Sequence, residues 1–313
     1  MATLRAAVVG CGHFGRFHAQ KYHELPEVEL VAVVDRDSSI AGALASEFGV
    51  EAMNDPAALA GRIDAASVVV PTRDHRAVAG ELFDLGVHVL VEKPLAGTLE
   101  DAAALVELAA ARGRVLQVGH LERFNAAIMA LADVLGEPMF VESHRLASFK
   151  PRGTDVDVIL DLMIHDIDLI QQLVRAPLAR VDAVGVPVLS SRDDIVNARL
   201  HFESGCVVNV TASRVSLKSE RKMRLFQRDA YVSIDFLARE ATIARRGKGE
   251  MFPGVPDIRV EQRQFEANDA LKLEIQAFLA AVRGEQPVAV TGEDGLRALD
   301  TALRIGQAMQ RPT

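Results

Sequence analysis

Residues 5–15 read Arg-Ala-Ala-Val-Val-Gly-Cys-Gly-His-Phe-Gly, and this stretch decides the fold. Its first five residues predict a short buried strand, and residues 16–25 after the last glycine have helical character. Glycines spaced in this way between a strand and a helix permit a tight turn and a close approach of the backbone to a pyrophosphate. The amides at the N-terminus of such a helix face the anion. The predicted cofactor residues of this loop are Gly10, Gly12, His13, Phe14 and Gly15.

A second apolar run, residues 29–34, ends at Asp35. The fingerprint places an acid at about this distance from the glycines, where it accepts the hydroxyls of the ribose. An acid there favours NAD. Arg36 follows directly and leaves an alternative open, because an arginine at this position can hold the 2′-phosphate of NADP.

Strand and helix signals alternate until about His120. They predict helices at 41–48, 76–85 and 99–112, and strands at 65–70, 87–91 and 115–118. Repeated βαβ units build a parallel sheet with right-handed crossovers. With 313 residues the chain exceeds the usual size of one core, so two domains are expected. We expect a doubly wound Rossmann domain over residues 1–120 and a second domain over residues 121–313.

Polar side chains follow two of the predicted strands. Residues 87–94 read Val-His-Val-Leu-Val-Glu-Lys-Pro and place Lys93 just beyond a buried strand, where ligands bind in open α/β sheets. The turn at residues 71–75 lies at the same sheet edge. An alternative for this turn is a helix cap, in which Thr72 or Asp74 covers free amides of the next helix.

The densest group of titratable residues in the second half lies on one predicted helix, residues 156–174. Apolar residues flank a narrow polar seam, so this helix should be mostly buried, with the seam facing a polar cleft. A carboxylate one turn before an imidazole can orient it and raise its basicity, although an inert buried ion pair is the alternative. Asp166 alone breaks the pattern. The seam consists of Asp161, His165, Asp168 and Gln172.

The rest of the second half is rich in strands. Alternating apolar and polar residues at 195–203 and 206–214 predict strands with one apolar face. Glycines and prolines in 247–256 predict a loop. We expect an open, largely antiparallel sheet covered by helices on one face. Its further strands should lie at 139–147, 180–188, 221–227 and 231–236, and its closing helices at 270–282 and 294–309.

The composition argues against several classes of function. A formal net charge of −8 disfavours nucleic acid as a partner. The two cysteines form neither a disulfide framework nor a metal-ligand spacing, which indicates a cytoplasmic protein without a metal cofactor. His13, His18 and His23 recur at a spacing that turns them away from one another on a helix, so they should be unrelated. No stretch reads as an export signal or a membrane span.

These landmarks together resemble the glucose-fructose oxidoreductase, inositol dehydrogenase and rhizopine catabolism family (Gfo/Idh/MocA) over essentially the whole chain. Glu92-Lys93-Pro94 stands in the family's Glu-Lys-Pro motif, and Asp161 with His165 in its Asp-x-x-x-His motif. The resemblance implies NAD-dependent oxidation of a secondary alcohol on a sugar-like ring. It also implies homodimers or homotetramers assembled through the C-terminal sheet. Its implied nicotinamide neighbours are Pro71, Thr72, His75, Glu92 and Lys93.

Removal of the alcohol proton requires a base. His165, oriented by Asp161, is the expected base, while Lys93 would bind the same oxygen and stabilise developing negative charge. The sequence leaves open which of the two accepts the proton first.

Residues 119–125, 150–152 and 161–169 resemble the sugar-nucleotide dehydrogenases of the family. Lys150 and Arg152 would then meet a diphosphate, although a solvated basic loop is the alternative. A free polyol or aldose such as inositol would not need these charges. A non-catalytic NAD-sensing regulator is a third possibility, against which the set of candidate catalytic residues argues. The expected substrate residues are Arg123, Asn125, Lys150, Arg152, Asp161 and His165.

Overall fold

A computed structural model of the chain describes residues 3–149 and 157–309, so Lys150 and Arg152 lie outside the described residues. The contacts divide the chain into two compact units. The first takes in the chain up to Leu121 together with Asp269–Leu299, and the second takes Glu122–Asn268 and the chain from Asp300. The expected division after residue 120 lies one residue from the first boundary. It differs at the C-terminal end, where Asp269–Leu299 packs with the first unit.

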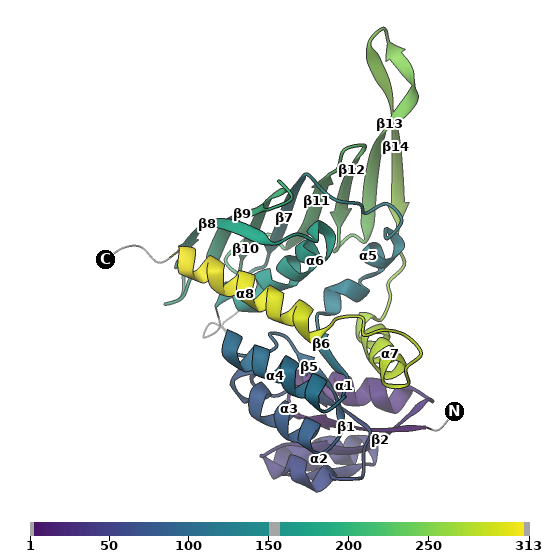
Figure 1. The fold of residues 1–313 in the computed structure, drawn as a ribbon, viewed down its shortest axis with the longest axis vertical. Helices are drawn as coiled ribbons and strands as arrows, with labels where there is room; N and C mark the ends of the chain where they lie inside the picture. The colour runs from purple at the N-terminus through teal and green to yellow at the C-terminus, as the bar shows by residue number, and fades with distance from the viewer. Residues whose placement is uncertain (1–2, 150–156, 310–313) are drawn as a thin grey trace. The chain divides into compact units, whose positions relative to one another are not determined.

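In the part of the chain that the structure describes, the first unit contains a six-stranded sheet in the order β3-β2-β1-β4-β5-β6 (Figure 1). Every neighbouring pair runs parallel, as expected for a Rossmann fold. The strand order reverses between β1 and β4, and dinucleotides bind beyond the strand ends at such a reversal. The strands are β1 (Leu4–Val9), β2 (Val28–Val34), β3 (Glu51–Met53), β4 (Ala65–Val68), β5 (His88–Glu92) and β6 (Leu116–Gly119).

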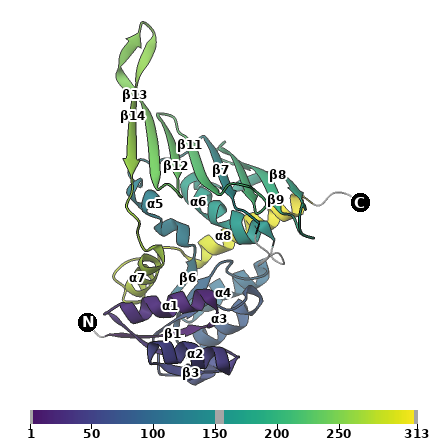
Figure 2. The same ribbon diagram turned by 180° about the vertical axis from the view of Figure 1, so that it is seen from behind.

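Some helices of the first unit begin at polar residues whose side chains cap the free amides. Asp37 accepts the Ser39 amide at the start of α2, and Asp269 accepts the Lys272 amide at the start of α7. Helix α7 lies beside α1 (Figure 2), because its apolar face joins the core under the sheet. The helices are α1 (His13–Glu24), α2 (Ser38–Phe48), α3 (His75–Asp84), α4 (Leu99–Ala111), α7 (Ala270–Val282) and the start of α8 (Gly292–Ala308).

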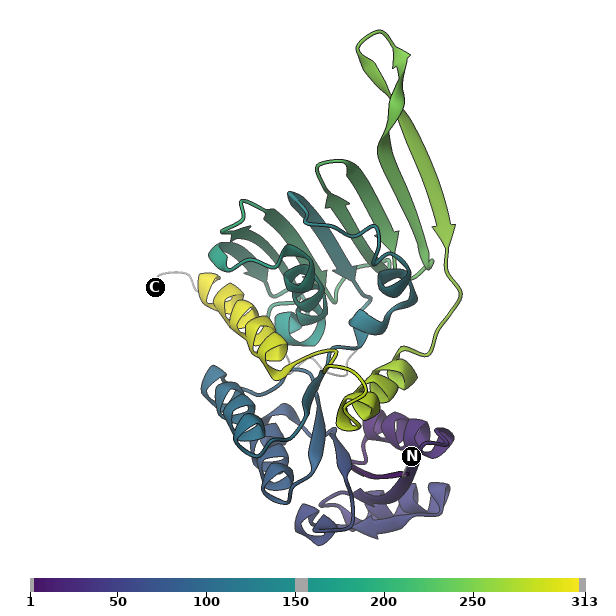
Figure 3. The ribbon, with the colours of Figure 1, turned by 45° about the vertical axis from the view of Figure 1, so that its right-hand side comes forward.

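The described residues of the second unit form an eight-stranded sheet in the order β14-β13-β12-β11-β7-β10-β9-β8 (Figure 3). Its neighbouring strands run antiparallel except β7 and β10, which run parallel. Alternate residues of β9 are buried, and α5 (Ala126–Ala130) and α6 (Ile164–Val174) cover one face, as expected. The strands are β7 (Phe140–Leu146), β8 (Leu178–Val186), β9 (Ile195–Phe202), β10 (Val207–Ser213), β11 (Glu220–Phe226), β12 (Ala230–Asp235), β13 (Glu240–Phe252) and β14 (Val255–Gln264).

The loop expected at residues 247–256 is wrong. Strand β13 continues to Phe252 and β14 begins at Val255, so the turn between them is only two residues long. Gly254 in this turn has a φ of +81°, which suits glycine. The pairing of β13 with β14 shifts register between Arg246 and Glu250 and again before Phe252. The other glycines, which the sequence pattern assigned to a loop, lie within the first of these bulges.

Candidate active site

The glycine loop after β1 is built around close backbone approaches. A Cβ on Gly10 would lie 2.4 Å from the carbonyl oxygen of Val69, and a Cβ on Gly15 would lie 1.8 Å from that of Gly10. A Cβ on Gly12 would meet no described atom within 4 Å, and no described side chain caps α1 at this residue. The described residues therefore leave room beside Gly12 at the start of α1, where the amides of such a helix bind a pyrophosphate. His13 and Phe14 beside them are exposed.

Asp35 holds the glycine loop in place. Its Oδ2 atom accepts the backbone amide of Cys11 at 2.8 Å, and its Oδ1 atom accepts that of Asp37 at 3.0 Å. A carboxylate has acceptor positions beyond these two, so the half-buried Asp35 also fits the hydroxyls of a ribose. Burial, with the nearby Asp35, raises the pKa of the Cys11 thiol to about 12, which keeps it neutral.

Arg36 forms an ion pair with Asp74, which lies in the short turn before α3. Among the described residues the Asp74 side chain makes no capping hydrogen bond to α3, so the cap interpretation is wrong for this residue. The carboxylate of Asp74 neutralises the charge of Arg36, which would otherwise be available to bind the 2′-phosphate of NADP. This arrangement fits NAD.

Lys93 directly follows β5 and is half-buried, as the strand pattern predicted. Glu92, the last residue of the strand, accepts a hydrogen bond from His18 Nε2 at 3.0 Å and another from the Lys93 amide at 3.1 Å. A Cβ on Gly119 would lie 3.1 Å from the Glu92 carboxyl group. Glu92 is therefore held between α1 and the end of β6. The Lys93–Pro94 peptide bond is cis.

His75 ties two strand ends together. Its side chain is buried, with Nδ1 3.0 Å from the Pro94 carbonyl oxygen and Nε2 2.9 Å from that of Val70. Burial lowers the pKa of His75, and a neutral imidazole donates one hydrogen bond. His75 thus fixes the turn after β4 against the turn after β5. Pro71 is exposed and Thr72 half-buried within the first of these turns.

In the second unit, the expected continuous helix is interrupted. Ile159–Met163 forms a turn of π-helix, and α6 begins only at Ile164. A π turn holds more residues than an α turn, so the angular spacing along this segment differs from that of a regular helix. Asp161 and His165 are half-buried, whereas Gln172 at the end of the predicted seam is exposed.

Asp168 of the predicted seam binds Arg123. Both guanidinium contacts are short, 2.8 Å from Nε and 2.6 Å from Nη2, and the Asp168 side chain is only 1% exposed. Asn125 caps α5 by accepting the Ala127 amide, and its Nδ2 atom donates to Glu122. The expected substrate residues Arg123 and Asn125 thus have partners within their own unit.

Asp166, which broke the helix pattern, is buried because Arg145 of β7 binds it. Arg145 Nε lies 2.7 Å from Asp166 Oδ2, and its Nη1 atom lies 2.9 Å from Glu122 Oε1. Burial opposes the charge of Arg145, but the two carboxylates outweigh burial and raise its pKa above the ordinary value. Arg145 was not predicted as a functional residue from the sequence. The signal for it was Asp166, an acid on an apolar face that requires a cation.

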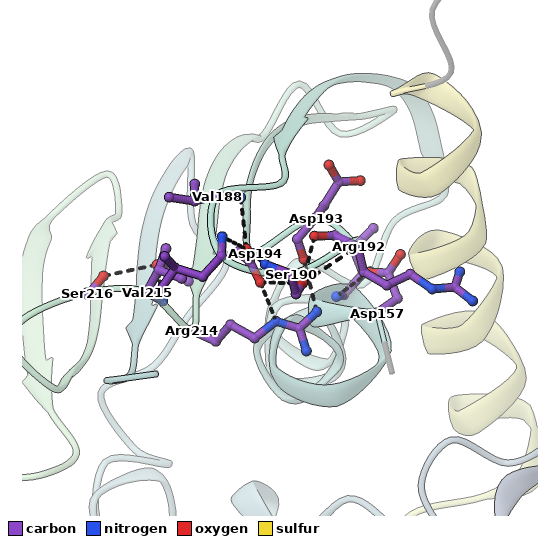
Figure 4. Close-up of polar contacts among 12 residues, drawn as sticks. Asp157, Val188, Ser190, Arg192, Asp193, Asp194, Arg214, Val215 and Ser216 are labelled. Carbon is purple, nitrogen blue, oxygen red and sulfur yellow. Dashed lines mark hydrogen bonds and ion pairs between the residues drawn. The ribbon is translucent and has the colours of Figure 1, made fainter. Parts of the chain in front are cut away.

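A third buried aspartate, Asp194, closes the turn between β8 and β9 (Figure 4). Arg214 forms an ion pair with it at 3.2 Å. Burial favours the neutral form, but hydrogen bonds from the Ser190 hydroxyl group and from the amides of Leu189, Ser190 and Val188 dominate and lower the pKa of Asp194 well below its ordinary value. The cluster fixes a turn. Its other donors are the amides of Val188 (2.8 Å), Leu189 (2.6 Å) and Ser190 (2.9 Å), and the hydroxyl of Ser190 (2.7 Å).

The described residues contain no group of three or more histidine, cysteine, aspartate or glutamate side chains that could hold a metal ion. No helix among them combines the length and the apolar composition that crossing a bilayer requires.

The chain is similar to known proteins along its whole length. The Gfo/Idh/MocA oxidoreductase family, NAD-binding Rossmann fold, matches residues 4–120, and the Gfo/Idh/MocA C-terminal domain matches residues 128–232. UDP-N-acetylglucosamine 3-dehydrogenase of Acidithiobacillus ferrooxidans is 41% identical over 311 residues, which cover 99% of this chain and 98% of that protein. A solved structure of that enzyme matches with a TM-score of 0.91 and 40% identity, covering 98% of both chains.

A more distant relative is the scyllo-inositol 2-dehydrogenase (NAD(+)) of Bacillus subtilis. It is 27% identical over 325 residues, covering 96% of this chain and 92% of that protein. The glycine loop, Asp35 and the parallel sheet of the first unit agree with the NAD-binding match. The chain therefore belongs to the Gfo/Idh/MocA family of oxidoreductases, and its first unit is the NAD-binding Rossmann domain.

Proposed function

We propose that this protein is an NAD-dependent dehydrogenase that oxidises the 3-hydroxyl group of UDP-N-acetylglucosamine. One observation carries the proposal: 41% identity over 99% of the chain to an enzyme named for this reaction. The inositol dehydrogenase of Bacillus subtilis is less similar, at 27% identity. A sugar nucleotide is therefore favoured over a free polyol.

Bound NAD supplies the acceptor for the hydride that leaves the carbon bearing the hydroxyl group. The residues of the chain must take the hydroxyl proton and stabilise the charge that develops on the oxygen. We propose His165, with Asp161 as its orienting partner, as the base, and Lys93 as the cation that binds the oxygen. Lys93 is the second candidate for the base. Its half-buried position directly after β5 supports a role beside the nicotinamide.

Binding of the cofactor is assigned to the first unit. Gly10, Gly12 and Gly15 receive the pyrophosphate, and Asp35 accepts the ribose hydroxyls. The remaining members of the proposed set line the same strand ends: His13, Phe14, Arg36, Pro71, Thr72, His75 and Glu92. The Arg36–Asp74 ion pair supports NAD over NADP.

For the diphosphate of the substrate we propose Lys150 and Arg152, because a planar guanidinium matches phosphate oxygens. Arg123 and Asn125 complete the proposed substrate residues. Replacing Arg152 with alanine should raise the KM for UDP-N-acetylglucosamine and leave the Kd of NAD unchanged. An unchanged KM would remove the diphosphate argument.

We further propose a cytoplasmic homo-oligomer assembled through the C-terminal sheet, as a dimer or a tetramer. Exposed apolar side chains on β8, Val184 and Val186, support a surface that a second copy covers. The two cysteines are unpaired thiols, which suits a reducing compartment. Light scattering of the purified protein would test the assembly, and a monomer at all concentrations would contradict it.

The central experiment follows NADH absorbance as the purified protein is incubated with NAD and one sugar at a time. The panel contains UDP-N-acetylglucosamine, UDP-glucose, myo-inositol and scyllo-inositol. We expect turnover with UDP-N-acetylglucosamine, and the product should carry a 3-keto group. Faster turnover of an inositol would contradict the substrate assignment. Tight NAD binding without turnover of any sugar would favour a regulatory protein.

A further inference from the structure

A chain of hydrogen bonds runs through the interior of the first unit and ends at the Glu-Lys-Pro motif. The hydroxyl groups of Tyr22 and Ser67 lie 2.9 Å apart. Ser67 Oγ lies 3.0 Å from His18 Nδ1, and His18 Nε2 lies 3.0 Å from Glu92 Oε1. The other carboxylate oxygen, Glu92 Oε2, accepts the Lys93 amide at 3.1 Å. Tyr22, Ser67 and His18 are all 0% exposed, so water does not replace these contacts.

The carboxylate fixes the direction of every hydrogen bond in this chain. An ionised Glu92 only accepts, so His18 Nε2 must carry the hydrogen. Nδ1 of a neutral His18 ring then accepts from Ser67, and Ser67 accepts from Tyr22. One orientation of each hydroxyl group and one tautomer of His18 satisfy all the contacts. The chain therefore runs from Tyr22 as first donor to Glu92 as last acceptor.

Glu92 is held as an anion although it is largely enclosed. Burial raises its pKa, but the hydrogen bond from His18, with the charge and the amide of Lys93, lowers it below the ordinary value. A Cβ on Gly119 would press on this carboxyl group, so glycine leaves the space that it fills. The titratable groups around the chain are His18 and Lys93 at Glu92, His75 facing Glu92, and Glu274 of α7 facing Tyr22.

We propose that His18, backed by Ser67 and Tyr22, is a positioning residue of the dehydrogenase: it holds Glu92 ionised and turned onto the Lys93 amide. The proposal rests on the proposed role of Lys93. His18 acts on the reaction through Glu92 in two ways. It fixes the backbone from which the Lys93 side chain extends, and it keeps a negative charge beside the Lys93 ammonium group, which stabilises the protonated lysine.

The alternative is that this chain of hydrogen bonds only stabilises the core of the first unit. Both alternatives predict lower stability when His18 is replaced, so stability does not discriminate between them. The pH profile of kcat/KM does, because a neutral Glu92 would no longer stabilise the Lys93 cation. The rising or falling side of this pH profile that reports the ionisation of Lys93 is the one lost in a Lys93→Met variant, and we call it the Lys93 limb.

Besides Lys93→Met, the test compares four variants with the wild type, using UDP-N-acetylglucosamine and NAD. In His18→Leu we expect the Lys93 limb to move to lower pH by about one unit and kcat to fall about tenfold. In His18→Gln, whose amide can still donate to Glu92, the limb should return toward its wild-type position. Tyr22→Phe removes one hydroxyl group without changing the packing and should move the limb in the same direction by less. His23→Leu, on the exposed face of the same helix, should leave the profile unchanged.

An unmoved limb in folded His18→Leu would overturn the proposal, and so would a glutamine variant that behaves like the leucine variant. If His18→Leu does not fold, Tyr22→Phe decides, and an unmoved limb there overturns the proposal. Wild-type rates in Lys93→Met would instead refute the proposed role of Lys93. An inactive Lys93→Met together with an unmoved limb in the His18 variants would refute the positioning role alone.

A second measurement needs neither substrate nor cofactor. In cofactor-free protein labelled with ¹⁵N-histidine, the ring of His18 should carry its hydrogen on Nε2 and none on Nδ1 at about pH 8. The His18→Gln variant assigns the signals. Protonation of Nδ1 in the wild type would reverse the direction of the chain and overturn the proposal.

Discussion

The two units bury their polar side chains in different ways. The first unit uses uncharged groups linked in a row, with one carboxylate at the end. The second unit uses full charges in matched pairs, in which a guanidinium group meets one or two carboxylates. The row is Tyr22, Ser67, His18 and Glu92, and the pairs are Arg145 with Asp166 and Glu122, Arg123 with Asp168, and Arg214 with Asp194.

Buried ion pairs and a buried row of hydrogen bonds have different consequences for a protein. A buried ion pair fixes geometry, because removing one member leaves an uncompensated charge in a medium that solvates it poorly. A row of hydroxyl groups and an imidazole costs less to bury, and it passes a change at one end to the charge at the other. Buried ion pairs suit a scaffold. A row of hydroxyl groups and an imidazole that ends at a carboxylate suits a place where the protonation state matters.

The largest effect should come from Arg145→Met, which removes the cation from between Asp166 and Glu122. We expect a loss of about 3–5 kcal/mol of unfolding free energy, because both carboxylates lose their buried partner. Urea denaturation followed by circular dichroism measures the loss. NAD binding by the first unit should be retained under conditions where the variant is folded.

The matched control is Arg180→Met. Arg180 also pairs with an aspartate, Asp182, but their side chains are 66% and 54% exposed. Such a pair contributes about 0–1 kcal/mol. Equal losses in the two arginine variants would break the distinction between buried and exposed pairs.

Lys93→Ala and His165→Ala come next, one in each unit. Each should lower kcat by about a hundredfold or more, equivalent to ~2.7 kcal/mol, because each removes a group proposed to act on the reacting oxygen. The Kd of NAD, measured by fluorescence or calorimetry, should stay within about threefold of wild type. A wild-type rate in either variant would remove that residue from the mechanism.

Asp194→Asn should cost about 2 kcal/mol at neutral pH, because an amide cannot accept from all the donors aimed at this position. The pKa of Asp194 is lowered in the folded protein, so its contribution is present above the ordinary value of 3.8 and is lost as the pH falls through the folded value. The difference between wild type and variant should therefore shrink only in acid.

Chemical denaturation at a series of pH values measures this dependence. The control is Asp182→Asn at the exposed pair, where we expect a change below about 0.5 kcal/mol. A constant difference between wild type and Asp194→Asn down to the acid limit would show that the contribution is not electrostatic.

The smallest effect should come from Arg36→Ala. Its side chain is 71% exposed and pairs with Asp74, so the loss in stability should be below about 1 kcal/mol. If Arg36 serves only this pair, the Kd of NAD will change less than about threefold. A selective loss of NADP binding would show that Arg36 also holds a 2′-phosphate.

The pattern of the sequence was sufficient for most of the sheet of the first unit, although the short edge strand β3 was not predicted. Strand residues buried on both faces form continuous apolar runs, and the glycine loop is a local motif. The predicted helix at residues 270–282 was also confirmed. Its membership in the first unit was not predicted, because an amphipathic face does not specify what covers it.

The second unit shows where pattern is insufficient. Glycines and prolines at 247–256 predicted a loop, but pairing with β14 extends β13 through them, with bulges at the glycines. The π turn at Ile159–Met163 likewise leaves no period in the sequence. For β13 the long-range partner overrides the local preference.

By itself, the sequence determined the parallel sheet, the phosphate loop with its acid at Asp35, and the place of Lys93 at a strand end. These depend on the residues of one short segment and its period. Only the tertiary structure decided that Asp166 is buried with Arg145, and that His18, Ser67 and Glu92 meet. A buried polar group requires a partner, and the sequence shows the requirement but not the partner, which arrives from another strand or helix.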